Sequence, residues 1–364
     1  MKIGIIGAGQ LARMLVLSGT PLGFTFSCIG KSGDCAGDVS SVVDIDLKDT
    51  KALLNWASNC DVVTFENENI DCNLIKDLHT KTNVHPPIAS IEITQDRLLE
   101  KDMLCSLGIK TTPYKDIKCI EDLTQAVEMH STPAIVKTRR FGYDGKGQFK
   151  LKNTDDIKEC WDALGNVADG IIYEGFINFD KEVSMICSRN VAGNIAFYPL
   201  VHNIHDKGVL IESIAPYCDD KLTVKAQEIA KIICDNYNYV GTLAIEFFVA
   251  GDTLIVNEIA PRVHNSGHWT IEGAVTSQFE NHLRAISNLG LGSTDSQNTV
   301  MLNCLGGIPK VQDTSAIKNA KRHCYSKDAK TGRKIGHVTI TMHSDTAKDD
   351  LKALRTLVDN ILDY

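Results

Sequence analysis

The stretch LAIEFFVAGDTLIVNEIAPRVHNSGHW, residues 243–269, decides how the rest of the chain is interpreted. Its first half predicts a β-hairpin, because two apolar, β-branched and aromatic runs meet at Gly251 and Asp252. Each run carries one acid, Glu246 on the incoming strand and Glu258 on the outgoing strand. A loop of residues 251–253 places these glutamates directly opposite each other. Because two facing carboxylates repel each other, the hairpin predicts a bound cation between them.

The expected cation is Mg²⁺, because no Lys or Arg lies between Glu246 and Glu258 in the sequence. Hard carboxylate oxygens suit this ion, which is commonly held by one or two carboxylates together with the oxygens of a substrate phosphate. Asn257 lies beside the second glutamate. The alternative interpretation is a solvated strand face with two unrelated acids.

The segment after the hairpin supplies anion-binding donors close to the predicted metal. Arg262, His264 and Asn265 follow the outgoing strand within a few residues. His264 and His268 are four residues apart, as in some zinc sites, but no Cys or acid beside them completes a tetrahedral set. A zinc site is therefore disfavoured.

The composition limits the classes of protein that the chain can belong to. A length of 364 residues predicts two or three domains, and a net charge of −8 gives no support for a nucleic-acid partner. The 12 cysteines are scattered without a Cys-x-x-Cys pair, which indicates reduced thiols in the cytoplasm. We identify no signal peptide and no apolar run long enough to span a membrane, so no membrane association is expected.

The N-terminal region predicts a parallel α/β sheet. A strand at residues 2–6 is followed by the glycine motif of residues 7–12 and then a helix, as in nucleotide-binding βαβ units. The dinucleotide fingerprint is incomplete, because Gly30 and Lys31 follow the second strand where an acid is required. Glu66 and Glu68 follow the strand at residues 61–65. They are either ligand-binding acids at the carboxyl edge of the sheet or members of a cap or turn.

Two further segments are candidates for phosphate binding. The strand at residues 134–137 leads into a loop at residues 138–148 that is rich in glycine and includes Lys146, which favours a lid over phosphates. A plain glycine turn is the alternative. The segment at residues 325–337 carries Lys327, Lys330, Arg333 and Lys334, the densest basic cluster in an acidic chain. It is either a solvated turn or a phosphate site.

Taken together, the motifs resemble the ATP-grasp superfamily and, within it, the 5-(carboxyamino)imidazole ribonucleotide synthetase family. The resemblance extends over nearly the whole chain in the order that the family shows. It rests on the following residues and segments: GAGQLARM at 7–14, Arg97 with Glu100 and Lys101, Val136 with Lys137, GYDGKGQ at 142–148, EIAPRVHNSGHW at 258–269, and GRKIGH at 332–337.

The resemblance implies a mixed α/β (α+β) chain with the ATP-grasp fold. It implies a Rossmann-like N-terminal domain at residues 1–95 and an ATP-grasp domain at 96–290, with a lid subdomain at about 110–175. A small C-terminal domain at residues 291–364 completes the chain. The nucleotide is then expected between the second and third domains.

The resemblance also implies a role for each site residue, with ATP and Mg²⁺ as the cofactors. Residues 174–177 are expected to form the hinge whose backbone meets adenine. The remaining roles are as follows: Arg97 and Lys137 for the ATP phosphates; Gly142, Tyr143, Asp144, Gly145, Lys146, Gly147 and Gln148 for the lid; Glu174, Gly175, Phe176 and Ile177 for the hinge; Glu182 and His205 for the ribose; Glu246 and Glu258 for Mg²⁺, with Asn257 beside them; Arg262, His264, Asn265 and Asp144 for catalysis; Lys327, Arg333 and Lys334 for the substrate phosphate.

The reaction that the resemblance implies belongs to purine biosynthesis. It is the ATP- and bicarbonate-dependent carboxylation of 5-aminoimidazole ribonucleotide through carboxyphosphate, by a homodimeric enzyme. The first alternative is an ATP-grasp ligase that uses formate or an amino acid. A Rossmann-type reductase is less favoured, because the acid of the dinucleotide fingerprint is missing.

Overall fold

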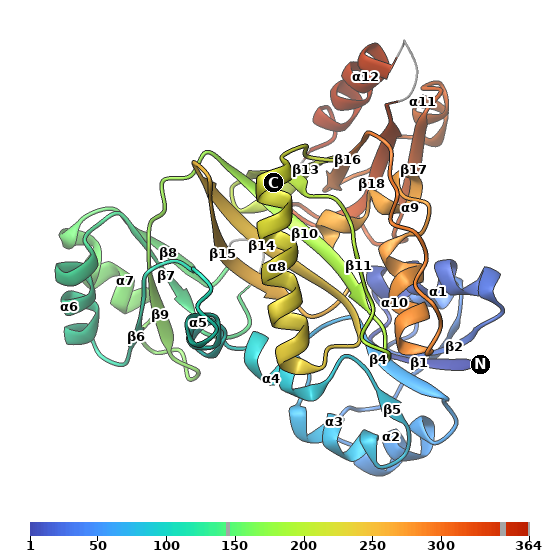
Figure 1. Cartoon of the computed structure of the whole chain (residues 1–364), viewed down its shortest axis with the longest axis horizontal. Helices are drawn as coiled ribbons and strands as arrows, with labels where there is room; N and C mark the ends of the chain where they lie inside the picture. Colours follow the sequence, from blue (N-terminus) through green and yellow to red (C-terminus); the bar gives the residue numbers. More distant parts are fainter. Residues whose placement is uncertain (143–145, 343–346, 363–364) are drawn as a thin grey trace.

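The computed structural model describes residues 1–142, 146–342 and 347–362. Across these ranges the strands form three separate sheets (Figure 1). One sheet is parallel and lies in the N-terminal region, and the other two are antiparallel. The mixed α/β fold class expected from the sequence is therefore confirmed.

The N-terminal sheet has the strand order β3-β2-β1-β4-β5, with every described pair parallel. This order confirms the predicted parallel sheet. Its elements are β1 (Lys2–Ile6), α1 (Gln10–Gly19), η1 (Thr20–Leu22), β2 (Thr25–Ile29), η2 (Cys35–Asp38), β3 (Ser41–Val43), α2 (Thr50–Ala57), β4 (Val62–Phe65), α3 (Cys72–His79) and β5 (Asn83–Val84).

Glu66 caps the first helix of this sheet. The backbone N–H groups of Gly9 and Ala12 donate to its two carboxylate oxygens, at 2.7 Å and 3.0 Å. The glycine is required, because a Cβ at Gly9 would lie 2.6 Å from Glu66 Oε1. In dinucleotide-binding proteins this helix N-terminus receives a pyrophosphate. Here a carboxylate of the chain occupies it, which argues against the reductase interpretation.

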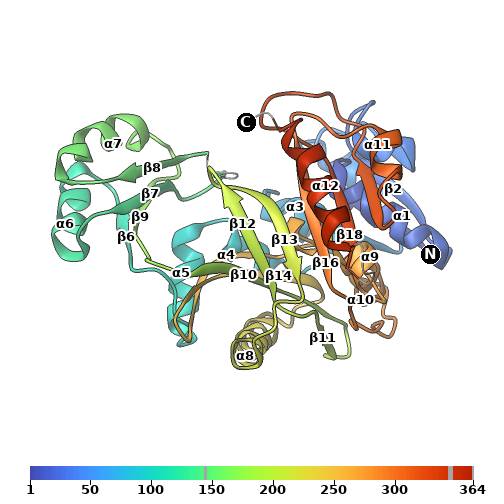
Figure 2. The ribbon, with the colours of Figure 1, turned by 90° about the horizontal axis from the view of Figure 1, so that it is seen from above.

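The smaller antiparallel sheet forms a lobe with two helices packed on it, at the left of Figure 1. Its strand order is β6-β9-β7-β8. Figure 2 shows that this lobe is set apart from the rest of the molecule. Its elements are β6 (Tyr114–Ile117), α6 (Ile120–His130), β7 (Ala134–Thr138), β8 (Gln148–Leu151), η3 (Thr154–Asp156), α7 (Ile157–Leu164) and β9 (Ile171–Gly175).

The larger antiparallel sheet connects the middle of the chain to its C-terminal part. Its order is β15-β14-β10-β12-β13-β16-β18-β17, and β11 pairs with β10. Because β13 pairs with β16, the sheet is continuous across residues 290–291. The predicted domain division at those residues stays a prediction. The strands are β10 (Lys181–Arg189), β11 (Ile195–Phe197), β12 (Val201–Asp206), β13 (Val209–Ala215), β14 (Gly241–Ala250), β15 (Thr253–Ala260), β16 (Thr299–Leu305), β17 (Ala320–Cys324) and β18 (Lys334–Thr341).

Helices cover the larger sheet and join it to the N-terminal sheet. Helix α8 packs beneath β10 and β14, as Figure 2 shows, and α10 packs against both β14 and α1. Helix α5, which carries Arg97, Glu100 and Lys101, follows a separate short helix, α4. The helices are α4 (Ile88–Thr94), α5 (Arg97–Ser106), α8 (Asp220–Tyr237), η4 (Asn265–Gly267), α9 (Thr270–Gly273), α10 (Gln278–Ile286), α11 (Val311–Ser315) and α12 (Ala347–Asp359). Within the described ranges, none of the helices has the length and apolar character needed to cross a membrane.

The predicted hairpin is present, but its loop differs from the expectation. The loop holds only Gly251 and Asp252, because Ala250 pairs directly with Thr253. Two-residue loops match the twist of the flanking strands. The register then shifts at a β-bulge between Glu246 and Phe247, and Glu246 pairs with Glu258. The predicted loop was wrong by one residue, and the extra residue in β15 at the bulge restores the predicted pairing of the glutamates.

A buried histidine joins the N-terminal sheet to the larger sheet. The N–H of Thr242 on β14 donates to Nδ1 of His282, at 3.1 Å. Nδ1 is therefore the acceptor nitrogen, and Nε2, 2.9 Å from Thr64 Oγ1 on β4, carries the proton. Burial lowers the pKa of His282 from 6.5 to about 3.

This histidine predicts a loss of stability in acid. Because its folded pKa lies below its unfolded pKa, the unfolded state takes up a proton that the folded state does not. Stability is complete above pH 6.5 and is lost as the pH falls towards 3. Between pH 6.5 and pH 5 the loss from this group is about 2 kcal/mol. Urea denaturation at pH 7 and pH 5 should show that His282→Gln loses about that much less than the parent. Equal losses in both proteins would contradict the assignment.

Candidate active site

The two glutamates of the hairpin form the centre of the candidate site. Glu246 is 14% exposed at its side chain, and burial, followed by repulsion from Glu258, raises its pKa to about 7. Two side chains lie beside the pair: the Arg97 guanidinium, with Nη2 3.7 Å from Glu258 Oε2, and the His264 ring, with Nε2 3.8 Å from Glu246 Oε1. A carboxylate whose charge is disfavoured by burial and by a second carboxylate fits a divalent cation.

The ligand set suits Mg²⁺ rather than zinc. Among the described residues no group of three or more His, Cys, Asp and Glu side chains could hold a metal by itself. Mg²⁺ does not require such a cage, because it usually keeps water and takes phosphate oxygens as further ligands. His264 and His268 have different partners: His264 Nδ1 contacts Ser266 Oγ at 2.9 Å, and His268 Nδ1 contacts Tyr325 Oη at 3.1 Å.

A buried carboxylate forms an ion pair with Lys137, the lysine that is predicted to bind the ATP phosphates. Glu174 on β9 lies between two cations, with Lys137 Nζ at 2.8 Å and Lys101 Nζ at 3.5 Å. Burial alone would raise the pKa of Glu174, but the two lysines outweigh it and lower the pKa to about 2. The sequence placed Glu174 in the adenine hinge and did not anticipate this ion pair.

Two charged residues on α5 were not chosen as site residues from the sequence. Lys101 is 1% exposed, and Glu100 accepts a hydrogen bond from the backbone N–H of Ile259, next to Glu258. Burial raises the pKa of Glu100 to about 8. Their helical spacing could have indicated that they are buried, because both precede the buried Leu104 by one turn and share its face.

Arg97 connects the glycine loop to the metal glutamates. It is the first residue of α5, and its Nη2 donates to the carbonyl of Gly142 at 3.3 Å. The same guanidinium faces Glu258. The structure thus brings together three elements that the sequence assigned to phosphate and metal binding.

The glycine loop is described only at its two ends. Tyr143, Asp144 and Gly145 lie outside the described residues, so their predicted roles in the lid and in catalysis stay predictions. At the far end, the backbone N–H of Thr138 donates to the carbonyl of Gly147 at 2.8 Å, and β8 begins at Gln148. Lys146, between these parts, is exposed.

The predicted hinge, residues 174–177, begins in the last two residues of β9 and continues beyond the strand. The N–H of Gly175 donates to the carbonyl of Pro113 at 2.8 Å. Phe176 is 43% exposed, and the Lys150 ammonium lies 5.5 Å from its ring centre. Ile177 is half-buried. This segment joins the small lobe to β10.

The predicted ribose residues lie on neighbouring strands. Glu182 is on β10 and His205 is on β12, with 2.9 Å between Glu182 Oε2 and His205 Nδ1. Burial would lower the pKa of His205, but the contact with Glu182 and the charge of Glu246 outweigh it and raise the pKa. The two residues therefore lie close together and near the metal glutamates.

The three predicted anion donors after β15 are held by neighbours. Arg262 pairs through two nitrogens with Glu68, with Nη2 3.0 Å from Oε1. The two acids that follow β4 thus have separate structural partners. Burial lowers the pKa of His264 well below 6.5, so its ring is neutral. The side-chain amide of Asn265 exchanges hydrogen bonds with the amide of Asn303, at 3.0 Å and 2.8 Å.

The basic cluster lies in a loop, residues 326–334, which we call the basic loop. The N–H of Tyr325 donates to the carbonyl of Ile335 at 2.9 Å and closes its base. Lys327 donates to the side chain of Gln10 in the N-terminal glycine motif, and Arg333 Nη1 lies 3.3 Å from the carbonyl of Asp328. Burial lowers the pKa of His264, and the charge of Lys334 adds to this effect. The same charge partly opposes the rise in the pKa of Glu246 that burial and Glu258 cause. The charge at this end of the basic loop therefore acts on the carboxylate centre.

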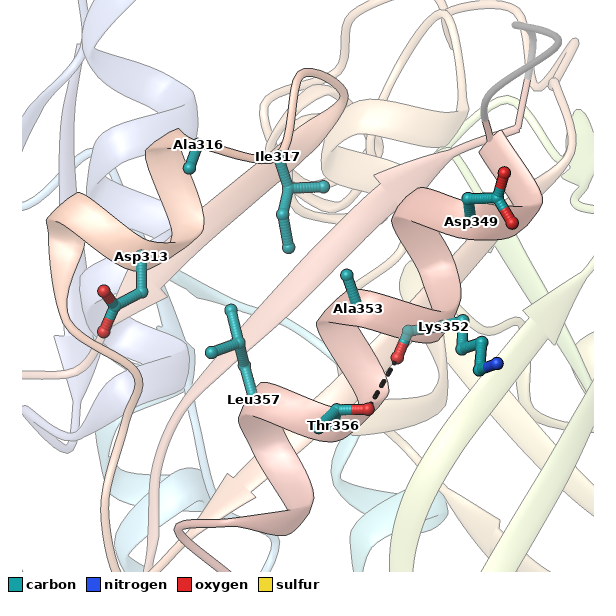
Figure 3. Close-up of a pocket in the computed structure, with 8 residues that line it drawn as sticks. All are labelled: Asp313, Ala316, Ile317, Asp349, Lys352, Ala353, Thr356 and Leu357. Carbon is teal, nitrogen blue, oxygen red and sulfur yellow. Dashed lines mark hydrogen bonds between the residues drawn. The ribbon is translucent and has the colours of Figure 1, made fainter.

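A surface pocket lies away from this site. It lies between α11 and α12 in the C-terminal part, and Figure 3 shows the eight residues that line it. None of them is a predicted site residue. The pocket mixes apolar side chains such as Ile317 and Leu357 with Asp349 and Lys352, and it does not bring together phosphate- or metal-binding groups.

The sequence matches three family descriptions along its length. The ribonucleotide synthetase preATP-grasp domain covers residues 1–95, the ATP-grasp domain covers 102–279, and the phosphoribosylaminoimidazole carboxylase C-terminal domain covers 299–350. The resemblance that the sequence motifs carry is thereby confirmed.

Curated relatives and solved structures agree with these matches. The chain is 44% identical over 342 residues to the N5-carboxyaminoimidazole ribonucleotide synthase of Pseudomonas aeruginosa, covering 93% of this chain and 94% of the relative. The Thermus thermophilus N5-carboxyaminoimidazole ribonucleotide synthetase structure is 42% identical, with a TM-score of 0.93 and 98% of each chain covered. An Aspergillus clavatus N5-carboxyaminoimidazole synthase structure, in complex with ADP and 5-aminoimidazole ribonucleotide, is 30% identical, with a TM-score of 0.89 and 99% of each chain covered.

The buried triad of Lys101, Glu174 and Lys137 predicts a large and non-additive effect on stability. Glu174→Gln leaves two lysines, one fully buried, without a counter-charge, which should cost about 3–5 kcal/mol of unfolding free energy. Adding Lys101→Met should recover about 1–3 kcal/mol of that loss. Urea denaturation of the single and double variants measures both effects.

The matched control is the exposed ion pair of Lys231 and Asp235 on α8. Lys231→Gln, which leaves the contact of Asp235 with Arg189 in place, should cost less than about 1 kcal/mol. A loss of that small size for Glu174→Gln, or purely additive losses in the double variant, would refute the role given to the triad.

Proposed function

The chain belongs to the N5-carboxyaminoimidazole ribonucleotide synthase family of ATP-dependent ligases, and we propose that it catalyses the ATP- and bicarbonate-dependent carboxylation of 5-aminoimidazole ribonucleotide. The product is N5-carboxyaminoimidazole ribonucleotide, an intermediate of purine biosynthesis. The observation that carries the proposal is the pairing of Glu246 with Glu258 beside Arg97, with Lys334 of the basic loop close enough for its charge to act on Glu246. This arrangement supports a shared centre for the charges proposed to bind the nucleotide and those proposed to bind the ribonucleotide.

The reaction has two steps. A bicarbonate oxygen attacks the γ-phosphorus of ATP, the bond to the β-phosphate oxygen breaks, and ADP leaves carboxyphosphate behind. The exocyclic amine of the ribonucleotide then attacks the carboxyl carbon, phosphate departs, and the amine loses a proton. Both steps depend mainly on positioning and on cations near the phosphates.

Glu246 and Glu258 are the residues proposed to hold Mg²⁺, with Asn257 beside them. The ion supplies positive charge to the phosphate oxygens during transfer. The raised pKa of Glu246 supports this assignment, because a carboxylate held in a buried pair gains most from a cation.

Arg97 and Lys137 are proposed to bind the ATP phosphates. The buried Glu174 fixes the position of Lys137, so little side-chain entropy is lost when a phosphate binds. Arg97 already lies between the carbonyl of Gly142 and Glu258. The lid role of residues 142–148, Asp144 included, is proposed from the family resemblance.

The nucleoside part of ATP is assigned to the joint between the small lobe and the larger sheet. Residues 174–177 are proposed to meet adenine through their backbone, although the N–H of Gly175 is engaged with Pro113. Glu182 is proposed to accept hydrogen bonds from the ribose hydroxyls. Its contact with His205 supports this role by holding the carboxylate in place.

Arg262, His264 and Asn265 are proposed to surround the bicarbonate. Glu68 orients Arg262, whose guanidinium is well suited to a planar carboxylate. Because the ring of His264 is neutral, one of its nitrogens can accept a proton while the other donates one. The side-chain amide of Asn265 is fully engaged with Asn303 and His268, so the contribution proposed for Asn265 is mainly to hold the loop.

The finer expectations about the enzyme are also proposals. They are a homodimer, a cytoplasmic location, and a division into domains at residues 1–95, 96–290 and 291–364. The twelve cysteines, all in described parts of the chain, are free thiols, which supports a reducing compartment. Light scattering tests the dimer directly.

The direct test of the proposed function is ADP release measured with each substrate omitted in turn. Release should require bicarbonate and should be accompanied by one carboxylated ribonucleotide for each ADP. Formate and free amino acids in place of bicarbonate should give no product. Product formation with formate would instead make the chain a different ATP-grasp ligase.

Glu258→Gln should remove most turnover while the fold is kept. A neutral amide cannot balance the cation, and loss of one such electrostatic partner typically lowers kcat by ~10²–10³-fold. The measurement is steady-state ADP release at saturating Mg²⁺, with circular dichroism as the check on folding. Wild-type turnover in this variant would remove Glu258 from the metal site.

Arg333→Ala should weaken binding of the ribonucleotide and leave binding of ATP nearly unchanged. Arg333 and Lys327 are proposed to bind the 5′-phosphate, and the loss of one charged hydrogen bond should lower kcat/KM for that substrate roughly 10- to 150-fold. The KM for ATP should barely change. A larger effect on ATP than on the ribonucleotide would assign the basic loop to the nucleotide, and no effect on either would make it a solvated turn.

A further inference from the structure

Tyr325 lies where the basic loop meets the loop after β15. Its side chain is buried, at 1% exposure, and its hydroxyl oxygen lies between two histidines. Nδ1 of His268 is 3.1 Å away, and Nδ1 of His337 is 2.7 Å away. His268 closes the 264–268 segment, and His337 lies on β18 three residues after Lys334.

The hydrogen bonds around His268 fix the role of its ring nitrogen. Asn303 Nδ2 donates to the carbonyl of Leu210 at 2.8 Å, which sets the orientation of its amide. The paired amide of Asn265 is then oriented as well, with Nδ2 donating to Asn303 Oδ1 and lying 3.1 Å from His268 Nδ1. Because Nδ2 only donates, His268 Nδ1 is an acceptor and the ring proton is on Nε2.

The contact of Tyr325 with His268 therefore continues a chain of oriented groups. The chain runs from Asn303 on the larger sheet through Asn265 and His268 to Tyr325, and from there to His337 on β18. The pairing of His323 on β17 with His337 continues it, with ring centres 4.4 Å apart and planes at 12°. Each of these side chains contacts more than one neighbour, so a displacement of one of them would displace the next.

The same tyrosine also closes the basic loop. Its N–H donates to the carbonyl of Ile335, and β17 and β18 pair immediately before this point. Lys327 and Arg333 of the basic loop lie beyond it. A shift of the Tyr325 ring would move the base of the loop relative to the segment that carries His264 and Asn265.

We propose that Tyr325 is a positioning residue that holds the basic loop in register with the 264–268 segment through its bridge from His268 to His337. The proposal rests on the proposed function, in which the basic loop binds the ribonucleotide and the segment binds bicarbonate. The distance between the substrate phosphate and the carboxyl donor then depends on this bridge. A misplacement on the order of 1 Å can cost about 10²-fold in rate, even when it arises away from the chemistry.

The bridge controls capture of the activated carboxyl group rather than its formation. The ATP-binding residues Arg97, Lys137 and Glu174 lie on α5, β7 and β9, outside the chain of contacts. When the basic loop moves, ATP is still cleaved but the amine is no longer aligned with the carboxyl carbon. Carboxyphosphate then reacts with water, and ADP accumulates without product.

The test is Tyr325→Phe, which removes one hydroxyl and keeps the ring. The expected result is a KM for the ribonucleotide raised roughly 10-fold and a ratio of product to ADP that falls to less than half the parent value. The KM for ATP should change less than twofold. These three quantities are measured in one assay that follows ADP and carboxylated product together.

The matched control is Tyr198→Phe. Tyr198 is also fully buried, and its hydroxyl also has two partners, the carbonyl of Thr276 and the amide of Asn281. The change should lower thermal stability by a similar amount and leave the product-to-ADP ratio unchanged. An equal fall in the ratio for both variants would show a general effect of lost stability and would overturn the proposal.

Two substitutions of His337 test the bridge from its other end. His337→Asn keeps a polar atom near the position of Nδ1, whereas His337→Leu keeps none. The first should retain most of the product-to-ADP ratio, and the second should lower it as Tyr325→Phe does. A normal ratio in both Tyr325→Phe and His337→Leu would overturn the proposal. A parent protein that forms no carboxylated product would instead overturn the proposed function, so the two failures are distinct.

Discussion

The repulsion between Glu246 and Glu258 is the constraint around which the site is organised. Two carboxylates paired across neighbouring strands are unfavourable without positive charge nearby. Arg97 from α5 faces Glu258, and the positive charge of Lys334 from the C-terminal part acts on Glu246. The neutral ring of His264 also lies beside Glu246. Elements that are far apart in the sequence therefore converge on one small region. The negative charge that remains on the two glutamates is the charge that the proposed Mg²⁺ would offset.

Away from that centre, buried polar pairs orient the groups that act there. Glu174 fixes Lys137, and Glu68 fixes Arg262, so both cations are placed before any ligand binds. Such preorganisation lowers the entropy lost on binding. Glu66 uses its carboxylate on the first helix instead, which removes the anion site that a nucleotide-binding βαβ unit would otherwise offer. The carboxylate of Glu66 thus takes the place at this helix N-terminus that a dinucleotide pyrophosphate would need.

Continuity of the larger sheet explains how distant segments act together. Strands from the middle and the C-terminal part of the chain are joined at β13 and β16, so the basic loop is attached to the same sheet as the glutamate hairpin. Two buried histidines strengthen the junctions. His282 joins the larger sheet to β4, and His268 joins the 264–268 segment to Tyr325. Both are neutral, because burial lowers their pKa values.

The sequence by itself determined the hairpin, the parallel N-terminal sheet and the clustering of candidate ligands, because these follow from strand periodicity and from residues close together in the chain. It determined the pairing of Glu246 with Glu258 but not the two-residue loop and the bulge that produce it. The tertiary structure alone decided which charged side chains are buried and which partner each of them has. Arg262 meets Glu68 across 194 residues, and no local pattern reports a partner at that distance. Lysine is normally a surface residue. Only the packing of α5 against the sheets places Lys101 beside Glu174.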